Sequence, residues 1–203
     1  TYLHEGGGGA VLGSIRPQPL PFNSRGELEL SDVIAAIKPD DYHYARTRLL
    51  CLENTQGGKV LSLNYMQEAG DIARKNALKF HLDGARVFNA AVKLGEPVSA
   101  ITSLFDTVSI CLSKGLAAPV GSVLVGDSRT ISKARRLRKM VGGGMRQAGI
   151  LAAAGIYALT HHVDRLTEDH RRAKDLANAL SQMNSLSIVE EPQTNMVVLD
   201  LPD

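Results

Sequence analysis

Three groups of polar residues stand directly after short apolar runs that are typical of buried strands. They are Glu53-Asn54-Thr55, the segment Asp83-Gly84-Ala85-Arg86, and Ser113-Lys114-Gly115. In an open sheet of parallel strands, ligands bind beyond the carboxyl ends of the strands. We therefore expect these groups to meet in one crevice that holds a carboxylate, a lysine and an arginine.

This combination of side chains suits pyridoxal phosphate (PLP). A lysine amine can form an imine with the cofactor, and a carboxylate beside the pyridine nitrogen keeps that nitrogen protonated, so that the ring can accept electrons. An amino-acid substrate brings its own carboxylate, which an arginine binds at two points. Lys114, Asp83 and Arg86 could fill these three roles. From the pattern alone, the alternative for Lys114 is an ordinary lysine in a surface loop.

Two other interpretations remain open at this point. His81 and Asp83 form a His-x-Asp pair, which a distant His162 or His170 could complete as a triad for non-haem iron, making the protein an oxygenase. Such triads usually lie on β-barrels, and this interpretation leaves Lys114 unexplained. The other interpretation is a catalytically incomplete fragment that keeps the fold and only pairs with other chains.

The elements that must position these residues alternate between strand and helix over the first two thirds of the chain. Such alternation predicts an α/β fold, with a mostly parallel sheet that helices cover on both faces. From about residue 163 the chain is typical of a second α+β unit, so we expect a large domain over 1–162 and the beginning of a small one over 163–203. The expected strands are 48–53, 80–83, 107–112 and 122–125, with a further strand near the end, and the expected helices are 28–37, 65–79, 86–94, 128–140, 150–161 and 163–183.

The glycine run at residues 6–9 is a weak candidate for a phosphate-binding loop. Such a loop follows a strand and opens a helix, but only five residues precede this run, and Pro17, Pro19 and Pro21 follow it. We expect a flexible turn near a ligand instead.

Composition excludes some kinds of partner. The net charge of +2 is too small to indicate nucleic acid or a membrane surface, and no apolar stretch reaches the 18 residues of a membrane span. The basic stretch 133–139 and the histidines His161, His162 and His170 are expected on exposed helix faces. Cys51 and Cys111 lie in apolar runs, so we expect buried free thiols and a reducing, cytoplasmic location.

Several segments resemble the threonine aldolases that have the aspartate-aminotransferase-like fold. Residues 81–90 are similar to the aspartate segment of that family and residues 113–122 to its PLP-lysine segment, and Lys114 follows Asp83 by 31 positions, as in the family. Further family-like segments are 45–48, 52–55 and 139–149. The resemblance covers nearly the whole chain.

The resemblance implies a PLP-dependent fold type I enzyme that cleaves L-threonine or L-allo-threonine to glycine and an aldehyde. It implies a homo-oligomer, a dimer of dimers with shared active sites that act on a small amino acid. The roles it implies are cofactor attachment for Lys114, pairing with the pyridine nitrogen for Asp83, binding of the substrate carboxylate for Arg86, contact with the substrate hydroxyl for His43, lining of the substrate side chain for His4, an active-site position for Lys139, and a place near the phosphate for Arg146.

Some family features have no counterpart in this sequence. They are the histidine that stacks on the cofactor ring, the glycine–threonine phosphate cup and a C-terminal arginine. We therefore expect the sequence to be an internal fragment of a longer enzyme.

Overall fold

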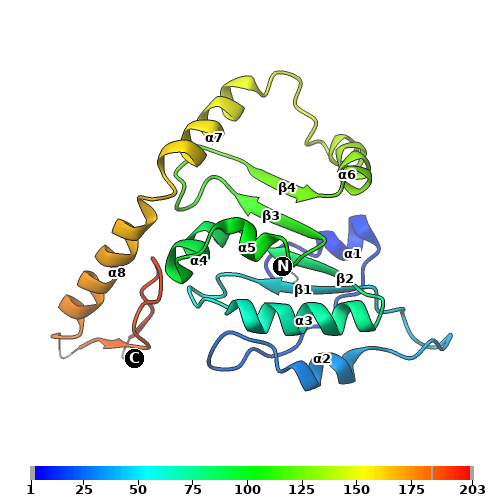
Figure 1. Cartoon of the computed structure of the whole chain (residues 1–203), viewed down its shortest axis with the longest axis horizontal. Coiled ribbons are helices and arrows are strands. Elements are labelled where there is room, and N and C mark those ends of the chain that lie inside the picture. The colour runs from blue at the N-terminus through cyan, green and yellow to red at the C-terminus, as the bar shows by residue number, and fades with distance from the viewer. Residues whose placement is uncertain (1–2, 184, 202–203) are drawn as a thin grey trace.

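The computed structural model describes residues 3–183 and 185–201. At its centre lies a four-stranded sheet with the strands in chain order, β1 (Leu49–Glu53), β2 (Lys79–Asp83), β3 (Thr107–Cys111) and β4 (Ser122–Gly126) (Figure 1). The first three strands are parallel and β4 is antiparallel to β3. The predicted α/β class and mostly parallel sheet are confirmed. The strand β4 reverses direction because only the loop 112–121 joins it to β3, and a parallel return needs a longer crossover.

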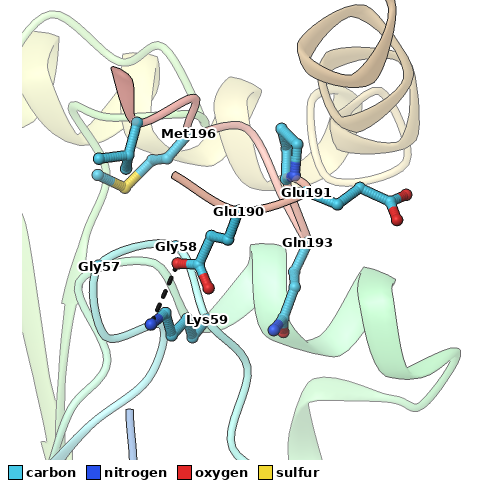
Figure 2. Close-up of a pocket in the computed structure, with 9 residues that line it drawn as sticks. Gly57, Gly58, Lys59, Glu190, Glu191, Gln193 and Met196 are labelled. Atoms are coloured by element: carbon cyan, nitrogen blue, oxygen red, sulfur yellow. Dashed lines mark ion pairs between the residues drawn. The ribbon is translucent and has the colours of Figure 1, made fainter. Parts of the chain in front are cut away.

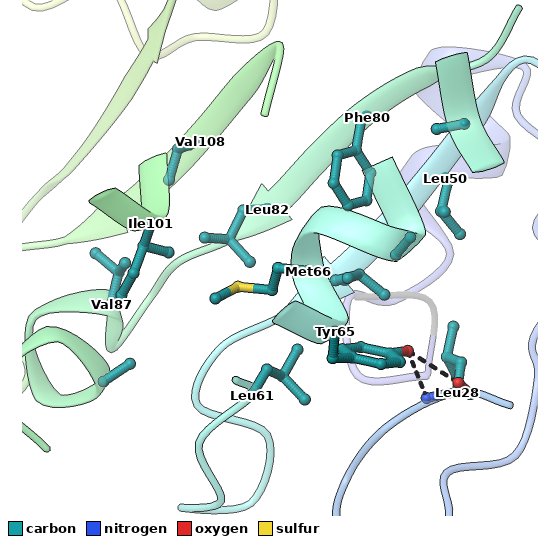
Figure 3. Close-up of a cluster of buried hydrophobic side chains, with 14 of the residues drawn as sticks. Leu28, Leu50, Leu61, Tyr65, Met66, Phe80, Leu82, Val87, Ile101 and Val108 are labelled. Atoms are coloured by element: carbon teal, nitrogen blue, oxygen red, sulfur yellow. Dashed lines mark hydrogen bonds between the residues drawn. The ribbon is translucent and has the colours of Figure 1, made fainter. Parts of the chain in front are cut away.

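Three helices cover one face of the sheet: α3 (Leu63–Lys75), α4 (Val87–Leu94) and α5 (Val98–Thr102). Alternate strand residues point to this face, and Figure 3 shows Leu82 of β2 in one cluster with Met66 of α3 and Ile101 of α5. These three side chains are fully buried. The helix α3 starts at Leu63 because the Ser62 side chain accepts a hydrogen bond from the Tyr65 N–H at 3.2 Å. This core holds the carboxyl ends of β1 to β3 in a fixed register.

The opposite face of the sheet is open in the described part of the chain, which corrects the expectation that helices cover both faces. Leu49 is exposed, and every residue of β4 is exposed. The two cysteines are free, as expected, but Cys51 is exposed and Cys111 is half-buried. The expectation of buried thiols was wrong because Cys51 points to the open face, whereas its neighbours Leu50 and Leu52 point into the core.

The glycine-rich segment near the start forms a helix rather than a flexible turn, which corrects our expectation. Gly6 and Gly7 have φ angles of 57° and 72° and form a turn, and the helix α1 (Gly8–Gly13) follows at once. The next helix, α2 (Leu30–Ala36), is shorter than the predicted 28–37 and buries Val33. The segment before α2 is joined to α3 by the Tyr65 hydroxyl, which donates to Leu28 O and accepts from Leu28 N, both at 2.9 Å.

The last third of the chain contains three helices and two short strands. The helices are α6 (Ser128–Met140), α7 (Gly149–His161) and α8 (Leu166–Leu180), and the strands β5 (Ser187–Ile188) and β6 (Leu199–Asp200) form an antiparallel pair. Asp127 caps α6, which contains no buried residue, so its basic side chains lie on a solvated helix as predicted. The helix α8 contacts α4 and β5 (Figure 1). Within residues 3–183 and 185–201, no helix combines the length and the apolar character that a membrane span requires.

The segment after α8 returns to the loop that follows β1, and we call this contact the tail clasp (residues 57–60 with 190–196). Figure 2 shows Lys59 directed at Glu190, with Nζ 3.1 Å from Oε1. The Thr194 hydroxyl donates to Gly58 O at 2.8 Å, and Gln193 Oε1 accepts from Val60 N at 3.0 Å. The clasp encloses a void of about 10 Å³, which has room for about one water molecule and none for a cofactor.

Candidate active site

The carboxyl ends of β1, β2 and β3 lie at one edge of the sheet. Glu53 and Asp83 are register partners, and Asp83 is in turn the partner of Ser109. The chains stay paired just past this point, because Asn54 N donates to Asp83 O at 3.0 Å and Gly84 N donates to Ser109 O at 2.8 Å. The edge is therefore a rigid platform for Glu53 and Asp83.

Asp83 is placed by the turn that leads into α4. Its Oδ1 accepts a hydrogen bond from Ala85 N at 3.2 Å, and its side chain is half-buried on the open face of the sheet. The next residue must be glycine, because a Cβ at Gly84 would lie 2.9 Å from Ser109 O. The tight turn directs Arg86, the residue before α4, toward the same edge.

The charges of four side chains interact at this edge. Burial, and then the nearby Asp83 carboxylate, raise the pKa of Glu53 above its usual value. The positive charges of Arg86 and Lys114 act on Glu53 in the opposite direction. Asp83, Arg86 and Lys114 thus all lie near enough to Glu53 to influence its charge, and their meeting in one crevice stays a prediction.

Lys114 lies in the loop between β3 and β4, and we call residues 113–118 the lysine loop. The Lys114 side chain is exposed. Ala117 N donates to Lys114 O at 2.8 Å, and Ala118 N donates to Leu112 O at 2.9 Å, so the loop is a closed turn. Ala117 has a left-handed φ of 59°, which is unfavourable for a residue other than glycine.

The other predicted site residues are exposed and contact different groups. His43 lies in the loop before β1, at the amino end of the strand, and its Nδ1 donates to Asp41 Oδ1 at 2.7 Å. Lys139 lies at the end of α6 with Nζ 3.4 Å from Gly144 O. Arg146 lies in the loop after α6 and His4 in the turn before α1. Since Asp83 and Lys114 lie at the opposite edge of the parallel strands, the structure does not bring His43 to them.

The iron-site interpretation does not fit the structure. Within the described ranges 3–183 and 185–201, no three His, Cys, Asp or Glu side chains come together as metal ligands do. His81 is hydrogen-bonded through Nδ1 to Thr107 Oγ1 at 2.8 Å. His162 and His170, which could have completed the triad, contact Leu116 O and Asn89 instead.

The buried position of His170 corrects the expectation that it lies on an exposed helix face. His170 is 9% exposed and pairs with Asn89 of α4, which is 2% exposed. The spacing of the apolar residues could have indicated this, because Leu166, His170, Ala173 and Ala177 follow each other at helical intervals and form the buried stripe of α8. His162 is half-buried, and only His161 is fully exposed.

The residues at this edge fit PLP by their chemistry. A carboxylate, an amine and a guanidinium are present together, as the cofactor and an amino-acid substrate require. Two buried polar atoms also lack a hydrogen-bond partner in the described part of the chain: Thr55 Oγ1, just past β1, and Asn195 Oδ1, whose side chain lies beside Gly115. Buried polar groups are normally hydrogen-bonded, so these two atoms keep an unused hydrogen-bonding capacity.

Comparisons with known proteins show what the chain is similar to. The chain is 54% identical over 197 residues to the low specificity L-threonine aldolase of Escherichia coli (strain K12), a match that covers 97% of this chain and 59% of that protein. It is 43% identical over 208 residues to the low-specificity L-threonine aldolase 1 of Arabidopsis thaliana, covering 100% of this chain and 58% of the relative. The chain thus spans less than two thirds of the length of these relatives.

The fold is that of a solved structure, the threonine aldolase of Leishmania major. The TM-score is 0.77 at 16% identity, and the match covers 97% of this chain and 59% of that chain. This similarity confirms the predicted aspartate-aminotransferase-like fold. The sequence pattern of the beta-eliminating lyase family matches residues 1–203, the whole of this sequence. The chain therefore belongs to the beta-eliminating lyase family.

Proposed function

We propose that the full-length protein is a PLP-dependent aldehyde-lyase that cleaves L-threonine and L-allo-threonine to glycine and an aldehyde. The observation that supports the proposal most is that Asp83, the register partner of Glu53, and the positive charges of Arg86 and Lys114 all influence the pKa of Glu53. The names of the E. coli and A. thaliana relatives support the substrate class.

Each of the three residues has one task in this proposal. PLP, when bound, supplies the electron-accepting ring that allows the Cα–Cβ bond of the substrate to break. Lys114 holds the cofactor covalently, and its exposed amine leaves it accessible for exchange with the substrate amine. Asp83 keeps the pyridine nitrogen protonated, because an adjacent negative charge favours the charged form. Arg86 binds the substrate carboxylate with its planar fork.

The remaining residues are assigned roles by the same proposal. His43 orients or accepts the proton of the substrate hydroxyl, His4 lines the pocket for the substrate side chain, Lys139 lies in the active site and Arg146 contacts the phosphate. All four are exposed in this chain, so they are available to another part of the assembly. A dimer of dimers with shared sites would use them, and the exposed Ile150 and Tyr157 of α7 offer apolar surface for such contacts.

The proposal includes the domain organisation and the compartment. Residues 1–162 would form the cofactor domain and residues 163–203 the beginning of a small domain. A reducing, cytoplasmic location agrees with the two free cysteines.

The proposal is tested on Lys114 in the full-length enzyme. Borohydride reduction of the loaded protein, followed by peptide mass spectrometry, should place the cofactor on the peptide that contains Lys114. The variant Lys114→Ala should lose this label and the release of glycine and aldehyde from L-threonine, whereas Lys75→Ala, at the exposed end of α3, should keep both. Attachment of the cofactor to any other lysine would overturn the assignment, and a protein that takes up no PLP would be the catalytically incomplete form.

A further inference from the structure

We infer that α4, α7 and α8 form a seat for the lysine loop, in which Asn89, His162 and His170 are positioning residues for Lys114. The inference rests on the proposed function, in which Lys114 carries the cofactor. It concerns residues to which the proposed function assigns no role. We call the set of side chains that supports the loop the lysine seat (Phe88, Asn89, Ala158, His162, Leu166 and His170), to which His170 belongs through its contact with Asn89.

The lysine loop needs support from outside. Its two internal hydrogen bonds close the turn, but Ala117 adopts a left-handed conformation that an alanine disfavours. Such a conformation persists where the surrounding structure holds it. The loop therefore keeps its shape through contacts with other elements.

The first contact is apolar packing beneath the loop. Leu116 and Ala118 are buried in a cluster with Ala158 of α7 and Leu166 of α8, and Phe88 of α4 packs against it. At Gly115 the backbone lies directly on α8, because a Cβ there would lie 2.9 Å from Leu166 Cδ2. The residue after Lys114 is thus fixed by contact with α8.

The second contact is a hydrogen bond to the loop backbone. His162 Nδ1 donates to Leu116 O at 2.6 Å, since a carbonyl oxygen can only accept. His162 is the C-cap residue of α7, and its backbone N–H donates to Ala158 O. The carbonyl of Leu116 in the lysine loop is therefore hydrogen-bonded to a residue of the segment that joins α7 to α8.

The third contact passes through a buried side-chain pair. Asn89 Nδ2 donates to His170 Nε2 at 3.1 Å, so Nε2 must be unprotonated and the imidazole neutral. Burial, and then the charge of Lys93, lower the pKa of His170, whereas Asp169 acts in the opposite direction. With Nδ2 committed to His170, the Oδ1 atom of Asn89 faces the loop, 3.3 Å from where a Cβ of Gly115 would be.

These contacts link the position of Lys114 to Asn89, 25 positions before it in the chain (114 − 89), and to His162 and His170, 48 and 56 positions after it (162 − 114 and 170 − 114). Lys114 is the residue before Gly115, so a shift of Gly115 off Leu166 and Asn89 also moves the Lys114 amine relative to Asp83. A misplacement of about 1 Å at a reacting group can reduce catalysis on the order of 100-fold. The lysine seat thus sets the reactive geometry without touching the substrate.

The test compares His170→Phe with His170→Gln in the full-length holoenzyme. Phenylalanine fills the space and removes the acceptor, whereas the glutamine oxygen can still accept from Asn89. We expect His170→Phe to lower kcat about tenfold or more with KM changed less. It should also move the pH midpoint of the visible absorbance, because the charge environment of the lysine nitrogen changes with its position. His170→Gln should restore both, and the matched control His161→Phe, on the exposed end of α7, should alter neither.

A measurement on the apoprotein separates the seat from the cofactor. Amide hydrogen exchange in peptides covering residues 112–118 should accelerate in His170→Phe and stay unchanged in His161→Phe. If His170→Phe does not fold, His162→Phe carries the same test, because it removes only the bond to Leu116 O.

Two failures are distinguishable. Suppose that the wild-type enzyme binds PLP and is active, and that the variants have the same kcat and the same pH midpoint of absorbance, even where their unfolding temperature falls. This outcome would overturn the lysine seat and leave the proposed function intact. A wild-type enzyme that attaches no cofactor to Lys114 would overturn the proposed function itself, and with it the role inferred for the seat.

Discussion

Glu53 and Asp83 are direct register partners at the carboxyl ends of β1 and β2, which places two carboxylates side by side on the open face of the sheet. Neighbouring strands lie about 4.8 Å apart, so the two charges repel each other. The positive charges of Arg86 and Lys114 partly offset this repulsion for Glu53. The carboxylate pair and the two cations form one electrostatic unit, on which the predictions below depend.

Removing the charge of Glu53 should stabilise the apoprotein at neutral pH. The pKa of Glu53 is raised in the folded state, so its contribution to stability is present below the unfolded-state pKa and is lost as the pH rises through the folded-state pKa. Glu53→Gln should therefore unfold at a higher temperature than wild type at pH 7, by less than about 4 °C because the group is partly exposed. At pH 4 the difference should disappear. Thermal unfolding of wild type and Glu53→Gln at pH 4 and pH 7 checks this prediction. The control is Glu96→Gln, at an exposed position. An equal difference in unfolding temperature between wild type and Glu53→Gln at both pH values would contradict it.

Replacing Asp83 with asparagine should uncouple cofactor binding from turnover. Asparagine keeps the shape and can still accept from Ala85 N, but it loses the charge that holds the pyridine nitrogen protonated. We expect the full-length variant to retain its PLP absorbance while kcat for L-threonine falls on the order of 100-fold or more. Near-normal turnover in Asp83→Asn would rule out this role. Asp175→Asn, on the exposed surface of α8, serves as the control.

The change Arg86→Lys tests the binding of the substrate carboxylate. Lysine keeps the positive charge but cannot form the two parallel hydrogen bonds of a guanidinium. A charged hydrogen bond lost in this way corresponds to an increase in KM for L-threonine of about 10- to 100-fold, with a smaller effect on kcat. Steady-state kinetics decide the outcome, and an unchanged KM would exclude Arg86 from the substrate site. Arg74→Lys, in the exposed ion pair with Asp71 on α3, is the matched control.

His43 and Asp41 should act together on the choice between substrate diastereomers. Two hydrogen bonds, from the backbone N–H and then from the ring of His43, lower the pKa of Asp41, so a charged carboxylate orients the imidazole. We expect His43→Phe to change the ratio of kcat/KM for L-threonine and L-allo-threonine several-fold while PLP stays bound. Asp41→Asn should give a smaller change of the same sign. Loss of PLP with an unchanged ratio would instead assign His43 to the cofactor.

Local patterns predicted most of the elements. The strands β1 to β4 agree with the predicted ranges within one residue, because apolar runs closed by polar or glycine residues define them. The helix α6 begins and ends as predicted at Ser128 and Met140. The helix α5 was missed because it spans only Val98–Thr102, which is too short to show helical periodicity. The α1 segment was missed because glycine does not favour helices.

The site was predicted only as far as the sheet positions it. Asp83 ends β2, and Arg86 and Lys114 come shortly after β2 and β3, so the order of the strands was enough to place their charges near Glu53. The partners of His162 and His170 depend on how α7 and α8 return to the lysine loop and to α4, and no local pattern fixes that path. His43 lies in an irregular loop, so its place in an active site stays a prediction.

The tail clasp also sets the earliest point in synthesis at which the loop after β1 can form its contacts. Thr194 and Gly58 are 136 positions apart, so at a synthesis rate of about 5 to 20 residues per second the loop after β1 waits roughly 7 to 27 seconds for its partner to leave the ribosome. During that interval β1 has been synthesised, but the loop that follows it lacks the hydrogen bonds of the tail clasp. Closure of the clasp therefore follows the synthesis of all four strands of the sheet, and slower translation between residues 60 and 190 lengthens the interval in which the loop after β1 lacks this partner.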